Sequence, residues 1–293
     1  MQIGVIGGGP RGLAVMERIL ARFSKKHLQK RKKLSVAWFE DTVFGAGRIW
    51  NPYQTNALLM NTVASQLNAF PDKSTGLQDG YLTGPTFIKW LESLASQDFL
   101  RDDPALLAEA KNVKLNGYTS RALYGAYLCW AAQCLINKYR LEEVDIHLIR
   151  ERVESLERNS RRFLLQTNFG RKIEVQELVL AVGHVAQKGS EREKFFSEQA
   201  RALGLLYLPR GEATPREAAR ILSSNIVILK GMGLTFFDYI ELLTAYRGGR
   251  FVYSETDNKK FVYLPSGREP KIIACSRKGA PHHARGKNQK RPD

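Results

Sequence analysis

Cysteine is scarce in this sequence, and the spacing of its three residues matches no familiar metal or disulfide motif. Cys129, Cys134 and Cys275 form no C-x-x-C pair, which argues against a redox dithiol and favours a reducing compartment. No apolar run reaches about 18 residues, the length at which a transmembrane helix becomes a candidate. The opening residues, MQIGVIGGGPRGLAV, lack the basic start of a secretory signal peptide. These absences predict a soluble, cytoplasmic protein without a membrane partner.

Acidic residues are also few relative to basic ones. The 45 Lys and Arg against 29 Asp and Glu give a formal net charge of +16. Part of this excess is concentrated in residues 25–33 and 285–291. A positive field attracts polyanions, which makes nucleic acid a candidate partner. No zinc-finger, helix-turn-helix or RNP pattern accompanies the basic runs, so we expect solvated connections and regard nucleic-acid binding as the less favoured alternative.

The remaining composition is that of an ordinary globular chain, and its length of 293 residues favours two domains. Apolar periodicity predicts two strand–helix–strand units. The first has strands at residues 2–6 and 34–40 around a helix at residues 10–23. The second has strands at residues 225–230 and 271–275 around a helix at residues 235–246.

The region between these units is expected to hold loops, helices and a meander. We predict an ordered loop over 44–84, helices over 85–96, 120–139, 192–203 and 215–223, and strands over 145–149, 152–157, 162–167 and 172–182. Within the long helix, one stripe is expected to be core: Leu123, Tyr127, Trp130, Ala131 and Cys134. The fold class is therefore α/β with two dinucleotide-binding, Rossmann-like domains. Residues 1–224 would form the first, with a helical insertion at about 85–140 and a β-meander. Residues 225–293 would form a truncated second domain with a basic tail.

A glycine-rich turn follows the first predicted strand. Gly7-x-Gly9-x-x-Gly12 opens the helix, and Glu40 ends the next strand. The first glycine permits a tight turn, the second lets the backbone approach a pyrophosphate, and the third allows close helix–strand packing. A carboxylate at the end of the second strand can accept ribose hydroxyls. The pattern predicts a dinucleotide site; a turn without ligand, and for Glu40 a solvated strand end, are the alternatives.

A second glycine turn is less complete. Gly231-Met232-Gly233 follows the strand at residues 225–230, but Phe236 occupies the place of the third glycine. We interpret this segment as a second phosphate-binding turn, with a plain strand-to-helix turn as the alternative. The last predicted strand ends in Ser-Arg-Lys at residues 276–278 rather than in an acid. A hydroxyl and a guanidinium suit a 2′-phosphate and favour NADPH over NADH, although surface charge alone would also explain them.

A third signal is Ala181-x-Gly183 at the end of the meander. The order of first glycine loop, meander, Ala-x-Gly and second glycine loop resembles the two-dinucleotide-binding flavoprotein superfamily. Four segments carry a closer likeness: GGGPRGL (7–13), FGAGRIWNPYQTNALLMNT (44–62), GMGLTFFD (231–238) and LPSGREPKIIACSRKGAPHHARG (264–286). Through them essentially the whole chain resembles the FAD/NAD(P)-binding family that includes FAD-dependent urate hydroxylases and aspartate N-monooxygenases.

The resemblance implies a set of cofactor-binding residues. The FAD pyrophosphate would be held by Gly7, Gly9, Pro10, Arg11 and Gly12, and its ribose by Glu40. The isoalloxazine would be lined by Gly45, Gly47, Trp50, Asn51, Asn61 and Thr62, the adenine met by the backbone of Val153, and the ribityl–pyrophosphate flanked by Ala181 and Gly183. The nicotinamide cofactor would be held by Gly231, Gly233 and Thr235, with Arg277 at the 2′-phosphate. Trp50 could equally be a core aromatic residue, and His184 is given no catalytic role.

The resemblance also implies an activity. It predicts an FAD- and NAD(P)H-dependent oxidoreductase, monooxygenase-like, with hydride passing from NADPH to FAD before oxygen is activated on a small polar substrate. The flavin carries this chemistry, so no catalytic side chain is assigned and no metal is expected. The Phe-x-Gly-x-x-x-His motif of many flavin monooxygenases is absent between Gly183 and Gly231.

Members of this family are considerably longer than this chain. We therefore expect it to be the N-terminal portion of a larger architecture, with a C-terminal half or a partner chain completing it. The alternative function is an FAD- or nucleotide-binding module without turnover.

Overall fold

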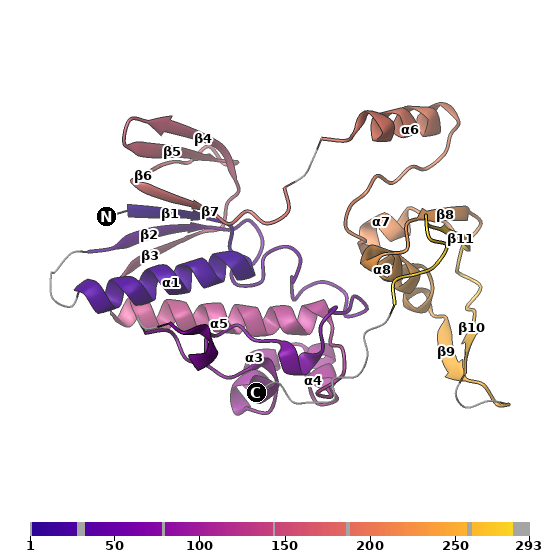
Figure 1. Cartoon of the computed structure of the whole chain (residues 1–293), viewed down its shortest axis with the longest axis horizontal. Helices are drawn as coiled ribbons and strands as arrows, with labels where there is room; N and C mark the ends of the chain where they lie inside the picture. Colours follow the sequence, from indigo (N-terminus) through magenta and orange to yellow (C-terminus); the bar gives the residue numbers. More distant parts are fainter. Residues whose placement is uncertain are drawn as a thin grey trace. The chain divides into compact units, whose positions relative to one another are not determined.

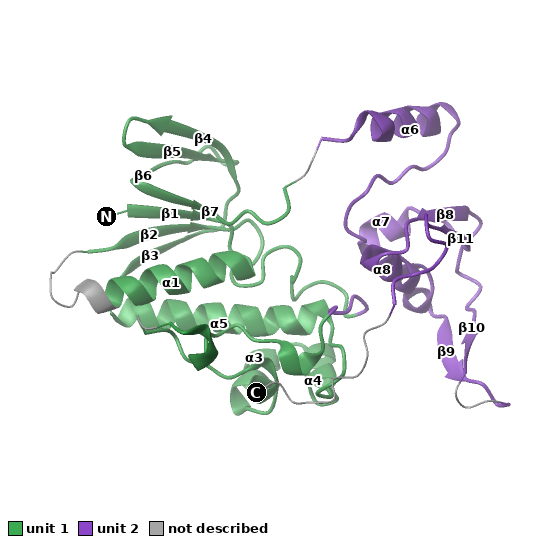
Figure 2. Cartoon of the chain, viewed as in Figure 1, with its two compact units in different colours: residues 1–56, 62–185, 288–293 green, residues 57–61, 186–287 purple. Residues whose placement is uncertain are grey.

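The computed structural model describes residues 2–27, 33–77, 80–142, 144–185, 188–256 and 260–283. The chain divides into two compact units, drawn in separate colours in Figure 2. Unit 1 takes in Met1–Asn56 and Thr62–Val185, and unit 2 takes in Ala57–Asn61 and Ala186–Lys287. The domain boundary expected at residue 224 stays a prediction. Of the basic runs, residues 28–32 and 285–291 lie outside the described residues.

Unit 1 is built on a four-stranded parallel sheet with strand order β3-β2-β1-β7. Its strands are β1 (Gln2–Ile6), β2 (Ser35–Phe39), β3 (Asp145–Ile149) and β7 (Glu177–Leu180). Helix α1 (Pro10–His27) makes the crossover from β1 to β2, as the first predicted unit requires. Val5, Val36 and Trp38 are fully buried, as expected for parallel strands covered on both faces.

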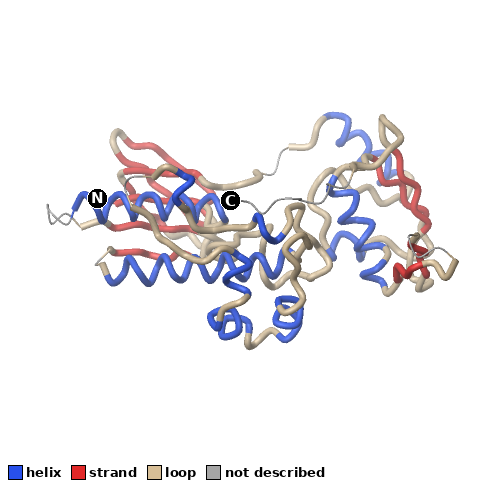
Figure 3. The backbone as a smooth tube through the Cα atoms, turned by 60° about the horizontal axis from the view of Figure 1, so that its bottom comes forward, coloured by secondary structure: helices blue, strands red, loops and turns tan. Residues whose placement is uncertain are grey.

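Different layers cover the two faces of this sheet (Figures 1 and 3). Helices α1 and α5 (Arg121–Leu141) lie on one face. The other face carries an antiparallel meander of β4 (Val153–Asn159), β5 (Arg162–Thr167) and β6 (Lys172–Val175). Leu165 and Val175 of the meander pack in one cluster with Ala37 and Phe39 of the sheet. The apolar face of the meander therefore completes the core of unit 1.

The strand predicted over residues 172–182 is wrong as a single element. It is two strands, β6 and β7, which belong to different sheets. Gln176 separates them and bonds with both its backbone and its side chain to Gln2: its N donates to the Gln2 carbonyl at 3.0 Å, and its Oε1 accepts from the Gln2 N at 3.1 Å. One residue is thus enough to move the chain from the meander to the edge of the parallel sheet.

The region after the first strand–helix–strand unit is more broken than predicted. The loop expected over 44–84 contains two short 3-10 turns, Ala64–Gln66 and Lys73–Thr75. The helix expected over residues 85–96 divides into α2 (Phe87–Leu91) and α3 (Leu94–Leu100). Helix α4 (Pro104–Ala110), which was not predicted, is N-capped by Asp103, whose side chain accepts from the Leu106 N.

Aromatic residues hold this helical region onto α5. Tyr127 is fully buried, and its ring lies within 6.2 Å, centroid to centroid, of those of Phe70, Phe87, Trp90 and Trp130. Its hydroxyl donates to the Pro85 carbonyl at 2.6 Å, and burial raises the pKa of this phenol. The predicted core stripe of α5 is confirmed for Leu123, Tyr127 and Ala131, whereas Trp130 and Cys134 are half-buried.

Unit 2 contains the second strand–helix–strand arrangement. Strand β8 (Ile226–Lys230) pairs in parallel with β11 (Lys271–Cys275), and the connection between them begins with α8 (Leu234–Leu243) and the 3-10 turn Ala245–Arg247. The core comprises Leu58, Ala213, Ala218, Ile221, Leu242 and Leu243. The other elements are α6 (Glu191–Ala202), α7 (Pro215–Ala219) and an antiparallel hairpin that was not predicted, formed by β9 (Arg250–Tyr253) and β10 (Phe261–Leu264). No described helix in either unit combines the length and apolarity that a bilayer crossing needs.

Candidate functional site

The first glycine turn lies at the carboxyl end of β1, where backbone packs directly on backbone. Gly7 has a φ of +106°, and a Cβ added there would collide with the Ala181 carbonyl. A Cβ at Gly12 would collide with the Gly7 carbonyl, which lies between strand and helix. The protein itself therefore requires glycine at both positions.

Gly9 is different, because the protein leaves room beside it. Its φ is not in the left-handed region, and the nearest atom to an added Cβ would be the Gly47 Cα at 3.7 Å, an ordinary contact. Neither backbone conformation nor packing accounts for a glycine here. Close approach of a ligand to the backbone, which is the role of the second glycine in a dinucleotide turn, would account for it.

Helix α1 begins directly after this turn, so the backbone amides of its first turn lie beside Gly9. Pro10 is its first residue, Arg11 is exposed, and the Leu13 N donates to the Gly9 carbonyl at 2.9 Å. The first turn of α1 contains no acidic residue. No carboxylate of the helix itself therefore neutralises the positive partial charge at the N-terminus of α1. A helix N-terminus of this kind is suited to an anionic ligand.

Glu40 follows β2, and its carboxylate is held rather than solvated. Its side chain is nearly buried; Oε2 accepts from the Gly8 N at 2.7 Å, and Oε1 accepts from the Thr42 N at 2.9 Å and the Thr42 Oγ1 at 2.6 Å. Two carboxylate oxygens offer about four acceptor positions, so capacity remains for a hydroxyl donor. Thr42 was not singled out in the sequence, although a hydroxyl two residues after a carboxylate is a recognisable local pairing.

The loop after Glu40 closes onto the glycine turn. The Gly45 N donates to the Gly8 carbonyl at 2.7 Å, and Gly47 lies against Gly9. Both Gly45 and Gly47 have positive φ, and a Cβ on Gly45 would strike the Leu128 carbonyl of α5. The structure therefore brings Gly45 and Gly47 to the first glycine turn, and their assignment to the isoalloxazine stays a prediction.

The other residues of the predicted isoalloxazine group lie farther along the chain. Trp50 is half-buried, and its ring packs edge-on against Tyr124 of α5 at a centroid distance of 5.9 Å, so it is at least an aromatic packing residue. Asn51 forms a turn in which its Oδ1 accepts from the Tyr53 N at 2.9 Å. Asn61 is grouped with unit 2, and Thr62 begins the next segment of unit 1.

Three predicted residues come from the meander and from β7. Ala181 reaches the turn: its N donates to the Ile6 carbonyl at 2.7 Å, and its own carbonyl faces Gly7. Val153 opens β4 and packs against the core cluster between the sheet and the meander. Gly183, with a φ of +68°, lies three residues beyond the last residue of β7, Leu180.

The second glycine turn repeats the geometry of the first in unit 2. Gly231 has a φ of +103°, and its N donates to the Cys275 carbonyl at 2.7 Å. Gly233 has a φ of −86° and caps α8 without any side-chain hydrogen bond, and no atom lies within 4 Å of an added Cβ. Thr235 is exposed in the first turn of α8. As at Gly9, nothing in the protein accounts for the glycine at 233.

Arg277 lies on a loop that is tied to this second turn. It follows β11 and is exposed. Five residues later the His282 N donates to the Met232 carbonyl at 2.9 Å, which joins the loop to the middle of the glycine turn. The loop that carries Arg277 is therefore held against the second glycine turn, and a contact of Arg277 with a 2′-phosphate stays a prediction.

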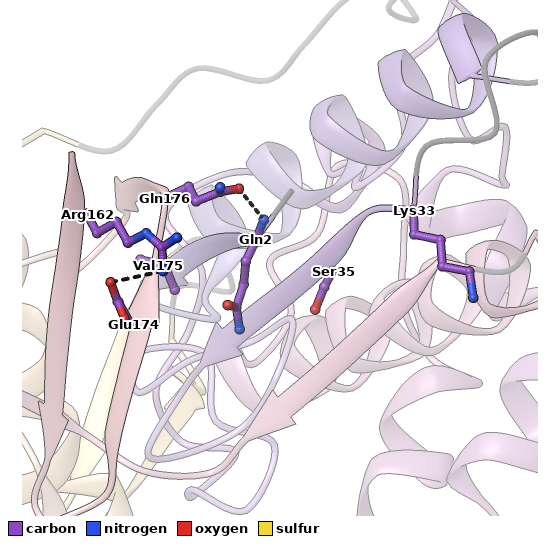
Figure 4. A pocket seen from close by; sticks show the side chains of 7 residues that line it. All are labelled: Gln2, Lys33, Ser35, Arg162, Glu174, Val175 and Gln176. Atoms are coloured by element: carbon purple, nitrogen blue, oxygen red, sulfur yellow. Dashed lines mark hydrogen bonds and ion pairs between the residues drawn. The ribbon is translucent and has the colours of Figure 1, made fainter.

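Three further features of the described residues bear on whether the chain holds another reactive site. Cys129 is buried, and burial raises the pKa of its thiol to about 12, so it is a poor nucleophile. The part of the chain that the structure describes holds no cluster of three metal-ligating side chains. A polar hollow of about 400 Å³ lies at the amino ends of β1 and β2, with the Arg162–Glu174 ion pair on its wall (Figure 4). It is at the opposite edge of the sheet from the glycine turn.

A family model described as FAD-NAD(P)-binding matches residues 4–185, the segment that holds the first glycine turn, Glu40 and the meander. The chain belongs to this FAD-NAD(P)-binding family. Its relatives include an L-aspartate N-monooxygenase (nitrosuccinate-forming) of Streptomyces davaonensis, 35% identical over 98% of this chain and 45% of that protein. A nitrosuccinic acid synthase of Aspergillus oryzae is 33% identical over 98% of this chain and 42% of that protein. The chain thus spans less than half the length of these relatives.

A solved structure overlaps more loosely. Bacillithiol disulfide reductase from Staphylococcus aureus has a TM-score of 0.46 and 13% identity, over 97% of this chain and 59% of that chain. The family assignment makes FAD and a nicotinamide nucleotide the cofactors of this fold.

The contrast between Gly9 and Gly12 gives a direct test of the FAD site. Gly9→Ala is expected to abolish FAD retention without loss of stability, because its methyl group would occupy space that only the ligand fills. Gly12→Ala, the matched control, is expected to lower the unfolding free energy by about 1–3 kcal/mol through overpacking. Flavin absorbance measures retention, and tryptophan fluorescence in urea measures stability, because all four tryptophans lie in unit 1. Normal FAD binding by Gly9→Ala would contradict the placement.

A second test concerns Thr42 as a positioning residue for Glu40. Thr42→Val removes the hydroxyl that donates to the carboxylate and keeps the side-chain shape. A hydrogen bond to a charged group contributes about 1.5–3 kcal/mol, so FAD affinity is expected to fall by roughly tenfold or more as the carboxylate loses its fixed orientation. Thr42→Ser retains the hydroxyl and is expected to bind within about twofold of the parent. Flavin fluorescence titration measures both; equal affinities for the Val and Ser variants would refute the role.

Proposed function

We propose that this chain is the FAD- and NAD(P)-binding portion of a flavin-dependent monooxygenase that acts on a small polar substrate. The relatives are named for N-oxygenation of L-aspartate or for nitrosuccinic acid synthesis. A small molecule carrying an amine is therefore the substrate class that we infer for the whole protein. The three cysteines form no disulfide, which supports a reducing, cytoplasmic location.

One observation carries the proposal. Each unit has a glycine in its strand-to-helix turn at which the protein leaves space for a side chain. Gly9 and Gly233 occupy the same position in their turns, follow a parallel strand and precede a helix. At both positions an alanine would fit the protein alone. Two such turns in one chain support two dinucleotides, whereas a simple NAD-dependent dehydrogenase needs one.

The residues of unit 1 would bind and orient FAD, which when bound accepts hydride from the nicotinamide and reacts with oxygen. The amides at the start of α1 would face its pyrophosphate, and Glu40 would accept a ribose hydroxyl while Gly8 and Thr42 hold the carboxylate. Gly45 and Gly47 would let the following loop approach the cofactor from the other side. No side chain of the described residues needs to act as a nucleophile.

The second turn in unit 2 would bind the nicotinamide nucleotide. The amides at the start of α8, capped by Gly233, would face its pyrophosphate. Arg277 would pair with a 2′-phosphate, which supports NADPH as the reductant with NADH as the alternative.

The relatives' greater length supports a role for further polypeptide. This chain spans 45% and 42% of the two relatives, so residues that complete the substrate site would come from a C-terminal half or a partner chain. The alternative function, a flavin- or nucleotide-binding module without turnover, would follow if this portion binds both cofactors but cannot pass hydride between them.

The visible spectrum of the FAD-loaded chain before and after anaerobic NADPH separates these functions. We expect a flavin band near its usual position that bleaches with NADPH, because the proposal gives this chain both a flavin site and a nicotinamide site. Dithionite, which reduces flavin without a nicotinamide site, is the control. A band that bleaches with dithionite but persists with NADPH would assign the chain to a binding module, and absence of flavin after FAD is added would overturn the proposal.

Arg277→Ala tests the reductant. Loss of the guanidinium is expected to weaken NADPH by tenfold or more and NADH by less than about twofold, because only NADPH carries the phosphate. Arg161→Ala, on an exposed turn of the meander, removes the same charge from unit 1 and is expected to change neither affinity. Isothermal titration with each nucleotide measures the constants. Equal losses for the two nucleotides would rule out the phosphate contact.

A further inference from the structure

A glycine occupies the interior of the long helix α5. Gly125 is buried, and its φ is not in the left-handed region. Because glycine is less favourable than alanine inside a helix, the helix itself gives no reason for it. The reason lies in the loop of residues 45–52: a Cβ added at Gly125 would collide with the Trp50 carbonyl and lie 3.3 Å from the Pro52 N. The loop therefore rests backbone to backbone on α5.

The first part of the same loop contacts α5 as well. A Cβ on Gly45 would strike the Leu128 carbonyl. Burial raises the pKa of the Cys129 thiol to about 12, and a hydrogen bond from the Ala46 backbone N–H opposes that rise. Residues spaced by three and four positions share one face of a helix, so Gly125, Leu128 and Cys129 form a single surface on which the loop lies.

The loop also contacts the first glycine turn. The Gly45 N donates to the Gly8 carbonyl at 2.7 Å, and a Cβ on Gly47 would come within 2.9 Å of the Gly9 Cα. Residues of one short loop thus touch both α5 and the turn that opens α1. A displacement of the loop from α5 would therefore change its distance from Gly9, the position at which the protein leaves space for a ligand.

Helix α5 is the better anchored of the two partners. Its other side carries Leu123 and Tyr127, which are both fully buried, and the Tyr127 ring packs among the aromatic residues of the helical region. The loop has turns but no helix or strand of its own over residues 45–52. If a side chain were added at Gly125, we expect the loop to move and the helix to stay.

We propose that Gly125 and Cys129 are positioning residues for the FAD site, and that they act through the loop of residues 45–52. Gly125 lets the Trp50 backbone reach the helix, and Cys129 holds the Ala46 amide. Neither residue needs to touch the cofactor. The inference rests on the proposed function, because it takes the space beside Gly9 as part of the FAD site.

The first test uses the full chain with FAD as the probe. Gly125→Ala adds one methyl group and improves the helix propensity at this position, so it does not weaken α5 itself. The methyl group is expected to displace the Trp50 carbonyl and the loop, and to raise the Kd for FAD about tenfold or more. Flavin fluorescence titration measures the Kd, and tryptophan fluorescence in urea shows whether the variant is folded.

The second test uses Cys129, and it serves also if Gly125→Ala fails to fold. Cys129→Ala removes the acceptor of the Ala46 hydrogen bond and is expected to raise the Kd for FAD about three- to tenfold. Cys129→Ser supplies an oxygen acceptor of similar size and is expected to bind FAD within about twofold of the parent chain. Cys134→Ala is the matched control: it is the same change in α5, five residues and about 140° around the helix from Cys129, and it is expected to leave the Kd unchanged.

The outcomes separate a positioning role from a structural one. A lower urea midpoint of Gly125→Ala with an unchanged Kd for FAD would overturn the proposal, since the glycine would then serve the fold alone. Equal Kd values for Cys129→Ala and Cys129→Ser, or equal losses for Cys129→Ala and Cys134→Ala, would also overturn it. Failure of the parent chain to bind FAD would overturn the proposed function and this role with it, whereas the other outcomes refute the role alone.

Discussion

The close approach of two backbones at Gly7 and Gly12 is the constraint on which the rest of unit 1 depends. With no side chain between them, the start of α1 lies directly against the end of β1, and the Ala181 carbonyl closes the third side. This contact sets where the helix amides point and how near Glu40 lies to Gly8. The remainder of the unit packs around this sheet: the aromatic layer around Tyr127 is buried, and the meander covers one face of the sheet.

The two glycine turns separate structural from functional requirements for the same residue type. Gly7, Gly12 and Gly231 are needed by backbone conformation or packing, whereas Gly9 and Gly233 are needed by neither. A sequence motif does not distinguish these two kinds of glycine. The space around an added Cβ does distinguish them, and it indicates the positions at which a ligand, rather than the fold, would require glycine.

Much of this architecture was predictable from the sequence, because the signals that end a strand and begin a helix come from neighbouring residues. Both strand–helix–strand units and the third glycine's packing role followed from such signals. The division at Gln176 was not, because an apolar run of strand residues does not reveal which sheet each half joins. The break between α2 and α3 and the hairpin of β9 and β10 were missed as well. Thr42 was missed because its partner, the Glu40 carboxylate, matters only once its orientation is known.

The single residue between β6 and β7 also limits how this family can vary in length. Gln176 is bonded to Gln2 by its backbone and its side chain, so one inserted residue would shift either the meander or β7 by a pleat and turn its buried side chains outward. The turn between β4 and β5, where Ser160 already adopts a φ of +48°, has no such tie to the parallel sheet. Insertions and deletions among homologues should therefore gather at the tip of the meander and avoid its junction with the sheet.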